Sequence, residues 1–460
     1  MANSSPIKEW AQLRPSSIAL KSHDKDYIWS ELDDLVDGVA ASLFSQGVKS
    51  SDVLTCVGKN SLEILLTYLA CMELGVICTL VMPQTRTDLD IKLKTLYPRE
   101  TPIKVCCTDP NLSQMESYRI DVQSSSSKSF AREYDQNKLA SIIFTSGSTG
   151  TPKAVAHTSR QHFSSASGLL DTLPFTKEDT WLLSLPMYHV SGLAIVYRWL
   201  HSGAALKLAS GDLPSDLIGV THASFVPTQL QRVLENNAVQ GLSHVLLGGS
   251  HIPLSLCQQA SSLGIETWVG YGMTEAASTV TAKKVDGSDG VGQVLKHRLV
   301  KLKHQRIYIS GETLASGYYK QGEIVSITHD TWFDSKDLGL WKNDELHVIG
   351  RADNMFISGG ENIHCEEIEA VLNQIPTITQ ALVVPIEDKE YGHRPVAVIK
   401  SHKGINIADI EQYLGRELIK FKWPIAYYKM PESLESHGIK VSRLAVNQWV
   451  WKQGYHAASH

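Results

Sequence analysis

The sequence lacks a long hydrophobic run that is free of charge. Its most apolar stretch, residues 61–81, contains Glu63 and Glu73, and a charge at the centre of a lipid bilayer costs on the order of 3 kcal/mol. We therefore expect a helix over residues 62–74, a stop at Gly75 and a buried strand over residues 76–81 rather than a membrane span. The first six residues are polar and contain no apolar signal segment, which favours a cytoplasmic protein.

An excess of basic charge is also missing. The chain of 460 residues has 43 Lys and Arg against 48 Asp and Glu, a formal net charge of -5. This balance argues against a dedicated nucleic-acid-binding protein and favours a small-molecule enzyme. The sequence does not decide between a monomer and a homo-oligomer.

Cysteine is sparse and unpatterned. The seven cysteines are scattered, with neither C-x-x-C spacing nor zinc-type spacing with histidine. This pattern indicates reduced thiols that pack in the core rather than a disulfide framework. Among the histidines, only His456 and His460 have H-x-x-x-H spacing, and they lie in a polar tail. We therefore expect no metal site built from protein ligands alone.

What the sequence does contain is a dense loop of glycine and hydroxyl residues. It follows the apolar run 139–144, which has the length and composition of a buried strand. Glycines let a backbone turn its N–H groups toward a ligand, hydroxyls add donors, and a lysine adds a cation, so the loop predicts polyphosphate binding. It is not a Walker A loop, and an ordinary polar turn is the alternative. Its residues of interest are Thr145, Ser146, Gly147, Ser148, Thr149, Gly150 and Lys153.

The order of apolar segments predicts an α/β fold. Strand-like segments alternate with longer patterned stretches after the loop, which is typical of a layered sheet architecture. The strand-like segments are 180–185, 204–208, 222–225, 245–247 and 266–269. A small α+β unit follows a run of short β-like segments, with helices over 365–373 and 408–418 and strands over 380–385 and 394–400.

Five further motifs follow the loop in order along the chain. The first four are residues 185–192 (LPMYHVSG), 247–250 (LGGS), 271–275 (YGMTE) and 335–339 (SKDLG), and the fifth is 350–363 (GRADNMFISGGENI). A last one, 438–443 (GIKVSR), lies near the C-terminus. Together with the loop they resemble the signature of the acyl-adenylate-forming superfamily, which includes acyl-CoA synthetases, luciferases and peptide-synthetase adenylation domains. The resemblance implies an AMP-binding domain of layered α/β subdomains over residues 1–350 and a small mobile α+β domain over 351–460.

The resemblance also implies the reaction and its nucleotide site. An acid and ATP with Mg²⁺ would form an acyl-adenylate, and coenzyme A would then take the acyl group as a thioester. Tyr271 and Gly272 would lie against adenine together with the backbone of residues 248–250, namely Gly248, Gly249 and Ser250. Thr274 would meet the α-phosphate and Glu275 would hold Mg²⁺, which takes one or two protein oxygens besides phosphate and water.

Other roles follow from the remaining motifs. The resemblance implies that Asp337 and Arg351 bind the ribose, that Asp353 is the hinge between the domains, and that Gly359 and Gly360 border the pantetheine arm. Lys440 would be the adenylation lysine, and Thr145, Lys153 and His189 would complete the catalytic set. Two departures stand out, because Lys336 replaces a usual glycine and Ile439 separates the usual Gly-Lys pair.

The acid is indicated by one arginine. Arg198 lies in the apolar, aromatic stretch 193–200, and a buried guanidinium needs an anionic partner. Residues 181–204 resemble the o-succinylbenzoate:CoA ligase family of menaquinone synthesis, whose substrate has two carboxylates. We expect Arg198 to bind the spectator carboxylate, with Ser191, Ser278 and Thr279 lining the acid site. The alternative is that the Arg198 side chain extends along its helix to the surface.

Two other functions remain open at this point. A related enzyme could activate another acyl or aryl acid or load a carrier protein, and an assay with coenzyme A alone would distinguish these. A nucleotide-binding protein without catalytic activity is a different class. The joint presence of Lys440, Glu275 and Asp337 argues against that class.

Overall fold

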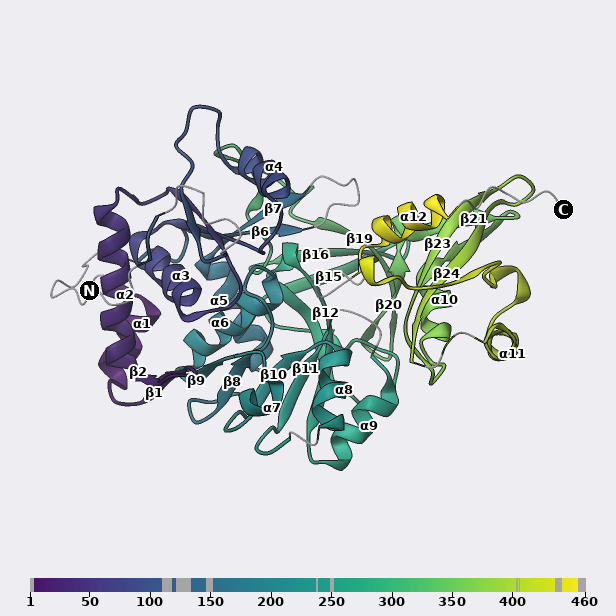
Figure 1. Cartoon of the computed structure of the whole chain (residues 1–460), viewed down its shortest axis with the longest axis horizontal. Helices are drawn as coiled ribbons and strands as arrows, with labels where there is room; N and C mark the ends of the chain where they lie inside the picture. The colour runs from purple at the N-terminus through teal and green to yellow at the C-terminus, as the bar shows by residue number, and fades with distance from the viewer. Residues whose placement is uncertain are drawn as a thin grey trace.

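The computed structural model describes residues 4–109, 118–120, 134–145, 152–236, 239–248, 252–402, 404, 406–434 and 441–453. A larger body contains the N-terminus, and a smaller unit at the C-terminal end extends from one side of it (Figure 1). The observed arrangement is the α/β fold expected from the sequence.

The first sheet of the body carries the predicted phosphate loop. Its strands β5, β3, β4 and β6 are parallel, and β7 pairs antiparallel with β6. Every residue of β3 and β4 is buried, as expected for short apolar strands that are covered on both faces. The strand order is β18 (Glu323–Val325), β17 (Gly317–Lys320), β7 (Lys153–Thr158), β6 (Leu139–Thr145), β4 (Ile77–Val81), β3 (Val53–Val57) and β5 (Val105–Cys107).

The second sheet carries the predicted adenine and acid segments. Its strands β9, β8, β10, β11 and β12 are parallel, and β13 pairs antiparallel with β12. The strand order is β14 (Gln293–Val294), β13 (Ser278–Lys284), β12 (Glu266–Met273), β11 (His244–Leu247), β10 (His222–Phe225), β8 (Thr180–Leu183), β9 (Ala205–Leu208), β1 (Ile18–Lys21) and β2 (Asp26–Ile28).

Two helices of the body core are buried on nearly all sides. The helix α3 (Leu62–Leu74) begins after Ser61, whose Oγ accepts the Ile64 N–H, and ends at Gly75, whose φ of 64° closes it. Residues 64–74 of α3 and 192–200 of α6 (Val190–Ser202) are all buried. A helix that is apolar all round belongs inside a protein. A side chain on α6 therefore has no solvent face along which to extend.

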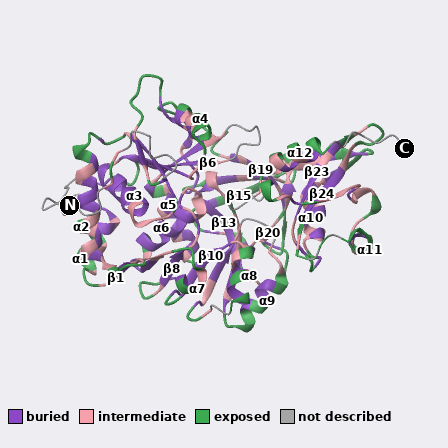
Figure 2. Cartoon of the chain, viewed as in Figure 1, coloured by how far each residue is buried: buried purple, intermediate pink, exposed green. Residues whose placement is uncertain are grey.

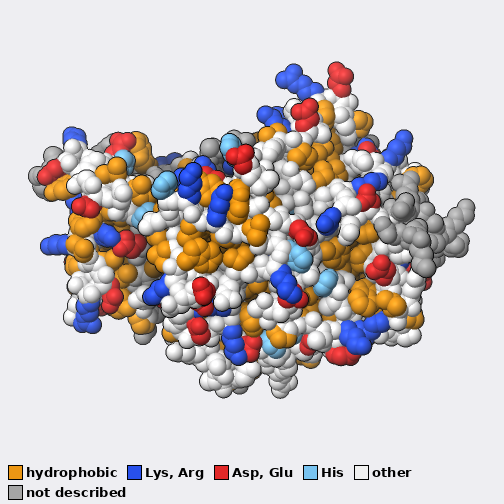
Figure 3. Space-filling view, turned by 180° about the vertical axis from the view of Figure 1, so that it is seen from behind, with side chains coloured by type: hydrophobic (Ala, Val, Ile, Leu, Met, Phe, Trp, Pro, Cys, Tyr) orange, Lys and Arg blue, Asp and Glu red, His pale blue; other side chains and the backbone are white. Residues whose placement is uncertain are grey.

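The other helices of the body cover the two sheets, and Figure 2 shows buried strands beneath their exposed faces. They are α1 (Pro6–Leu13), α2 (Trp29–Ser45), α4 (Arg86–Leu96), α5 (Ser159–Leu170), α7 (Leu213–Asp216), α8 (Pro227–Glu235) and α9 (Leu254–Ser262). None of the helices described is long and apolar enough to cross a membrane. On the face in Figure 3, acidic and basic side chains are interspersed.

A third sheet leads from the body to the small unit. It is antiparallel, in the order β15 (Arg298–Lys303), β16 (Arg306–Gly311), β19 (Phe333–Lys342) and β20 (Glu345–Arg351). The last strand ends at Arg351, one residue beyond the expected boundary, and a single 3₁₀ turn over Ala352–Asn354 follows. The connection between the two parts is therefore short and holds the predicted hinge residue Asp353.

The small unit is a sheet with helices on its faces. Its strands are β22 (Glu361–His364), β21 (Met355–Ser358), β24 (Gly392–Ser401), β23 (Ile378–Asp388) and β25 (Tyr427–Lys429), and its helices are α10 (Cys365–Leu372), α11 (Ile407–Glu417) and α12 (Arg443–Lys452). Both helices and both strands that the sequence predicted for this unit are present, within two or three residues of the expected bounds.

The cysteines lie in the core, as expected. Six of the seven are buried and Cys107 is partly exposed. Cys56 and Cys78 lie on adjacent strands with their Sγ atoms 3.6 Å apart, and no disulfide joins them. These thiols act as small apolar side chains.

Candidate active site

The base of the predicted phosphate loop is a hairpin. Thr145, the last residue of β6, pairs in register with Lys153, the first residue of β7. The loop residues Ser146, Gly147, Ser148, Thr149 and Gly150 lie outside the described residues. The antiparallel pairing fixes both ends of the loop on rigid strands, and it places the Lys153 ammonium 5.1 Å from the centre of the Tyr318 ring.

Tyr318 links this lysine to the predicted magnesium ligand. Its hydroxyl donates to Oε1 of Glu275 at 3.0 Å, so Lys153 and Glu275 both contact one aromatic side chain. Burial, and then the charge of Glu275, raise the pKa of Tyr318, which keeps the phenol a donor. The partner of Oε1 is thus a neutral hydroxyl, and a carboxylate oxygen is a ligand that a hard cation beside phosphate prefers. One protein carboxylate suits Mg²⁺, which takes one or two protein oxygens besides phosphate and water. Among the described residues, no group of three or more His, Cys, Asp or Glu could hold a metal.

A row of hydrogen bonds joins the predicted adenine and ribose residues. The Tyr271 hydroxyl donates to Oδ2 of Asp337 at 2.5 Å, and Arg351 Nη1 donates to its Oδ1 at 3.3 Å. Arg351 also forms two bonds with Asp353, at 2.7 and 2.8 Å. Burial, and then Asp337, raise the pKa of Tyr271 well above its usual value. An aromatic ring, a carboxylate and a guanidinium therefore lie in one row that ends at the predicted hinge.

The backbone at position 336 has a conformation that favours glycine, the residue that the motif usually has there. Lys336 has a φ of 68°, in the left-handed region, and its neighbour Asp337 is buried. A lysine in this conformation costs about 1–2 kcal/mol relative to ordinary backbone. With lysine at this position, Asp337 contacts Tyr271 and Arg351.

Strands β12 and β13 approach each other unusually closely. A Cβ on Gly272 would lie 2.0 Å from the Ser278 carbonyl oxygen, so only glycine fits there. Gly272 pairs with Thr279, and Met273 pairs with Ser278. The buried hydroxyls of Ser278 and Thr279 are thereby placed beside the adenine segment.

The segment before α6 is fixed by a residue that the sequence did not single out. Asn60 donates to the Leu183 and Leu185 carbonyls at 3.3 and 2.8 Å and accepts the Met187 N–H at 2.8 Å. His189 follows as the residue that caps α6, and its buried Nε2 has no hydrogen-bond partner among the described residues. Burial, and then the charge of Lys92, lower the pKa of His189, so the imidazole is neutral and able to accept or donate one hydrogen bond.

Arg198 is buried, and none of the described residues gives it an anionic partner. Its side chain is 3% exposed, which contradicts the alternative that it reaches the surface. The guanidinium lies 5.1 Å from the Trp181 ring centre, and Nη1 donates to Ser224 Oγ at 3.4 Å. Burial, and then the charge of Arg298, lower the pKa of Arg198 to about 9, and no carboxylate of the described chain contributes. Ser191 lies seven residues earlier on α6, which is two turns or about 10 Å along the same face.

Other predicted residues are not joined to this cluster by any described contact. Gly359 and Gly360 form the exposed turn between β21 and β22 in the small unit, with φ values of 58° and 89°. Gly248 lies directly after β11. Lys440, Gly249 and Ser250 lie outside the described residues.

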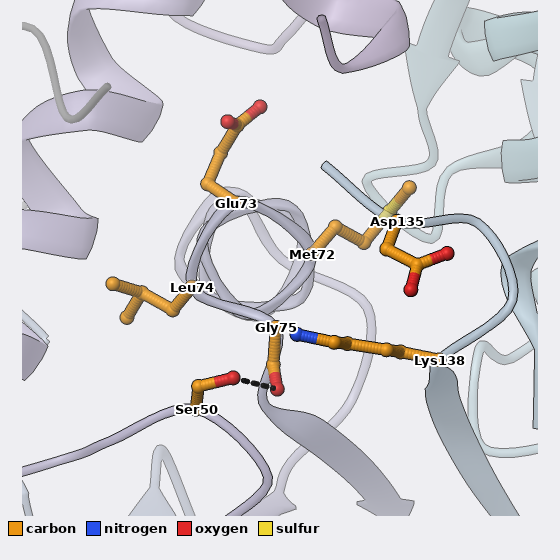
Figure 4. A pocket seen from close by; sticks show the side chains of 7 residues that line it. All are labelled: Ser50, Met72, Glu73, Leu74, Gly75, Asp135 and Lys138. Atoms are coloured by element: carbon orange, nitrogen blue, oxygen red, sulfur yellow. Dashed lines mark hydrogen bonds between the residues drawn. The ribbon is translucent and has the colours of Figure 1, made fainter. Parts of the chain in front are cut away.

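A recess elsewhere in the body carries none of the predicted site residues. It lies at the C-terminal end of α3, where Lys138 points toward Gly75 and Glu73 points to the opposite side of the helix (Figure 4). The Ser50 hydroxyl donates to the Gly75 carbonyl at 3.4 Å. These contacts close the end of a helix, and we assign no ligand to the recess.

Comparison with known proteins matches both parts of the chain to one family. A family model described as AMP-binding enzyme matches residues 7–319, and a model described as AMP-binding enzyme C-terminal domain matches residues 367–436. The 2-succinylbenzoate--CoA ligase of Salmonella typhimurium is 40% identical over 447 residues, which cover 97% of this chain and 97% of the relative.

Solved structures agree over nearly the whole length. An arginine-to-lysine variant of Escherichia coli MenE with bound OSB-AMS has a TM-score of 0.90 and 37% identity, covering 98% of this chain and 99% of the other. The Bacillus subtilis o-succinylbenzoate CoA synthetase has a TM-score of 0.79 with the acyl-adenylate intermediate OSB-AMP, at 25% identity, and 0.79 with ATP and magnesium, at 26% identity. These two cover 93% of this chain and 94% and 95% of theirs.

Proposed function

The chain belongs to the AMP-binding enzyme family, and from that premise we propose that it is the ligase for 2-succinylbenzoate. It converts 2-succinylbenzoate, ATP and coenzyme A to 2-succinylbenzoyl-CoA, AMP and pyrophosphate, a step in menaquinone synthesis. The observation that carries the proposal is the buried guanidinium of Arg198, beside which the described residues place no carboxylate. Because ATP and coenzyme A are its co-substrates, we place the enzyme in the cytoplasm.

The substrate supplies the anion that Arg198 lacks. 2-Succinylbenzoate has a succinyl carboxylate, which reacts, and a ring carboxylate, which does not. A planar guanidinium can bind a carboxylate through two parallel N–H donors, and burial strengthens such a pair. We assign the ring carboxylate to Arg198 and the walls of the acid site to Ser191, Ser278 and Thr279.

The first half-reaction brings two anions together. The succinyl carboxylate attacks the α-phosphorus, a carboxylate–phosphorus bond forms, and the bond to pyrophosphate breaks. Bound Mg²⁺, held by Glu275, would neutralise phosphate charge. Lys153, Lys440 and Thr274 stabilise the charge that grows on the phosphate oxygens, with Thr145 and His189 at the edge of the site. A cation about 4 Å away supplies up to roughly 4 kcal/mol at an effective dielectric of about 20, or about a thousandfold in rate.

The nucleotide is oriented by the row that starts at Tyr271. The Tyr271 ring offers adenine a stacking surface, and Gly272 and residues 248–250 offer backbone. Asp337 can accept hydrogen bonds from both ribose hydroxyls, with Arg351 beside it. The ribose would therefore bind beside Arg351, which precedes the hinge residue Asp353 by two positions.

The second half-reaction needs a different group at the acyl carbon. The small domain turns about Asp353, which withdraws Lys440 and brings Gly359 and Gly360 toward the acid site. The coenzyme A thiolate then attacks the activated carbonyl, a carbon–sulfur bond forms, and AMP leaves with the electrons of the broken carbon–oxygen bond. Rotation of rigid domains at a few hinge residues is an established way to alternate active-site groups.

Pyrophosphate release tests the proposal. The assay compares 2-succinylbenzoate, benzoate and 4-oxo-4-phenylbutanoate, which has the same reactive arm but no ring carboxylate. We expect 2-succinylbenzoate to react best by at least about a hundredfold in kcat/KM, the worth of one buried charged hydrogen-bonding pair. Formation of the CoA thioester is followed in parallel. Equal rates with 4-oxo-4-phenylbutanoate would contradict the substrate assignment, and transfer only to a carrier protein would contradict the acceptor.

A further inference from the structure

The corner between Glu275 and the acid-site strand has a strained backbone. Ala277 and Ser278 have φ values of 51° and 95°, and neither is glycine. Such conformations cost about 1–3 kcal/mol each and persist only where their surroundings hold them. The corner includes Ser278, directly precedes Thr279, and begins two residues after the predicted magnesium ligand. Whatever holds this corner therefore controls the geometry of the acid site.

A serine on α5 holds the corner. The Ser165 hydroxyl donates to the Ala277 carbonyl at 2.5 Å, across 112 positions of sequence, and both groups are buried. The hydroxyl has only one hydrogen, and its direction is not free. Arg298 Nη2 donates to Ser165 Oγ at 2.8 Å, so the oxygen is an acceptor on that side and its hydrogen must go to Ala277.

Arg298 is seated on α5 by contacts that leave it little freedom. Its side chain is buried, and it donates to the carbonyls of Ser165 at 2.9 Å and Lys296 at 2.7 Å. A Cβ on Gly168 would lie 2.2 Å from its Nη1, so the helix has a glycine where the guanidinium rests. Burial lowers the pKa of Arg298 to about 9, and no carboxylate of the described chain offsets that burial. A buried cation without a counter-ion is costly and needs a reason.

We propose that Arg298 is a positioning residue for the acid site, acting through Ser165 to hold the Ala277–Ser278 corner in place. The inference rests on the proposed function, because the corner matters only if Ser278 and Thr279 line the acid site. The Arg298 guanidinium donates to the Ser165 hydroxyl, and that hydroxyl donates to the Ala277 carbonyl. The expected result of breaking these hydrogen bonds is weaker binding of the acid with little change in the binding of ATP.

Two neighbouring serines provide a matched test. Ser165→Ala removes the donor to Ala277, whereas Ser164→Ala removes only a bond to Glu312, at 3.2 Å. We expect Ser165→Ala to raise the KM for 2-succinylbenzoate about tenfold, the worth of one buried hydrogen bond, and to change the KM for ATP less than about twofold. Ser164→Ala is expected to match the wild type in both. Thermal unfolding of each variant monitors the fold.

A second variant probes the Arg298 end of these two hydrogen bonds. Gly168→Ala should displace the guanidinium and produce the same selective rise in KM, although alanine is the better helix former. Equal values for Ser165→Ala and Ser164→Ala, or a parallel rise in both KM values, would overturn the inference while the wild type remains active. No pyrophosphate release from 2-succinylbenzoate by the wild-type enzyme would overturn the proposed function and this inference together.

Discussion

The body and the small unit treat a largely covered arginine in opposite ways. In the body, Arg198 donates to the neutral Ser224 hydroxyl and lies against Trp181. In the small unit, Arg443 donates to both oxygens of Glu369, to Glu366 and to a backbone carbonyl. Both guanidinium groups are largely covered, but only the second has a carboxylate among the described residues.

The presence or absence of a carboxylate partner distinguishes an arginine that stabilises the fold from one that is available to bind a ligand. A paired buried charge contributes to the fold mainly because removing one partner leaves the other unsatisfied. A buried charge without an anionic partner is already costly, so removing the charge alone should not weaken the fold, and we propose that its benefit comes from a ligand. The comparison therefore assigns Arg443 to the stability of the small unit and Arg198 to the chemistry of the body, and each assignment has a measurable consequence.

The largest effect is expected at the paired arginine. Arg443→Ala leaves the buried Glu369 carboxylate without its cation, at a cost of about 3–5 kcal/mol in the free energy of unfolding. Urea denaturation of the full chain measures it. Arg416→Ala, at an exposed position of α11, is the control and should change stability by less than about 0.5 kcal/mol. Equal losses of unfolding free energy in Arg443→Ala and Arg416→Ala would contradict a role of Arg443 in stability.

The next effect should appear in activity and not in stability. Arg198→Ala is expected to lower kcat/KM for 2-succinylbenzoate about 100-fold to 1,000-fold, because the ring carboxylate loses its buried partner. Arg198→Met, which removes the charge but keeps most of the side-chain volume, should unfold at the wild-type temperature or above it. The alanine variant also leaves a cavity, so its stability does not test the role of the charge. Arg232→Ala, at an exposed position of α8, should change neither quantity. Loss of stability in Arg198→Met would place Arg198 in the same class as Arg443.

Glu73 is a buried acid whose hydrogen-bond partner is neutral, as is that of Arg198, and the pH dependence of stability tests its protonation state. Burial raises the pKa of Glu73 to about 7, and its hydrogen-bond partner is the neutral Ser5 hydroxyl. Between pH 4.5 and 7 the Glu73 carboxyl therefore holds a proton in the folded state and has lost it in the unfolded state. Protonated Glu73 stabilises the folded state fully below pH 4.5, and this contribution disappears as the pH rises to 7. It amounts to as much as about 3 kcal/mol.

Glu73→Gln should remove that dependence. We expect the variant to match the wild type in unfolding free energy near pH 5 and to exceed it near pH 8, as measured by urea denaturation at each pH. Glu63→Gln, on the same helix but partly exposed, is the control. A constant difference between wild type and Glu73→Gln across this range would rule out a protonated Glu73.

The smallest effect concerns the backbone beside Asp337. Lys336→Gly should stabilise the protein by about 0.5 kcal/mol, because glycine relieves the left-handed strain but loses more entropy on folding. Lys336→Ala keeps the strain and should give no gain. The difference in melting temperature between the two variants measures the strain that glycine relieves. A higher melting temperature for Lys336→Ala would show that the lysine side chain, not the backbone, is unfavourable.

Local signals made much of the fold predictable. The helix over 62–74 was predicted to its last residue because Gly75 marks the stop, and it is followed by the expected strand. Strand β12 was predicted too short, over 266–269 instead of Glu266–Met273, because its glycines are poor strand formers. They are present because β13 approaches too closely for any side chain.

The site was less predictable where residues act through distant partners. The motifs pointed to Tyr271, Asp337 and Arg351, which the structure joins in one hydrogen-bonded row. Tyr318 and the pair Arg298–Ser165 were missed. Arg298 and Ser165 are 133 positions apart, and much of their contact is with backbone carbonyls, which every residue type carries. Such contacts leave no mark in a single sequence.

The burial of the thiols has a practical consequence for watching the two parts of the chain. Only Cys107 is not fully buried, so Cys107→Ser gives a protein whose accessible thiols are those that are added by design. Ile218 on the body and Ile419 on the small unit are each 67% exposed and suit replacement by cysteine. A pair of fluorescent dyes at these two positions would convert the proposed rotation of the small unit into a change in energy transfer, which can be followed in single molecules during turnover.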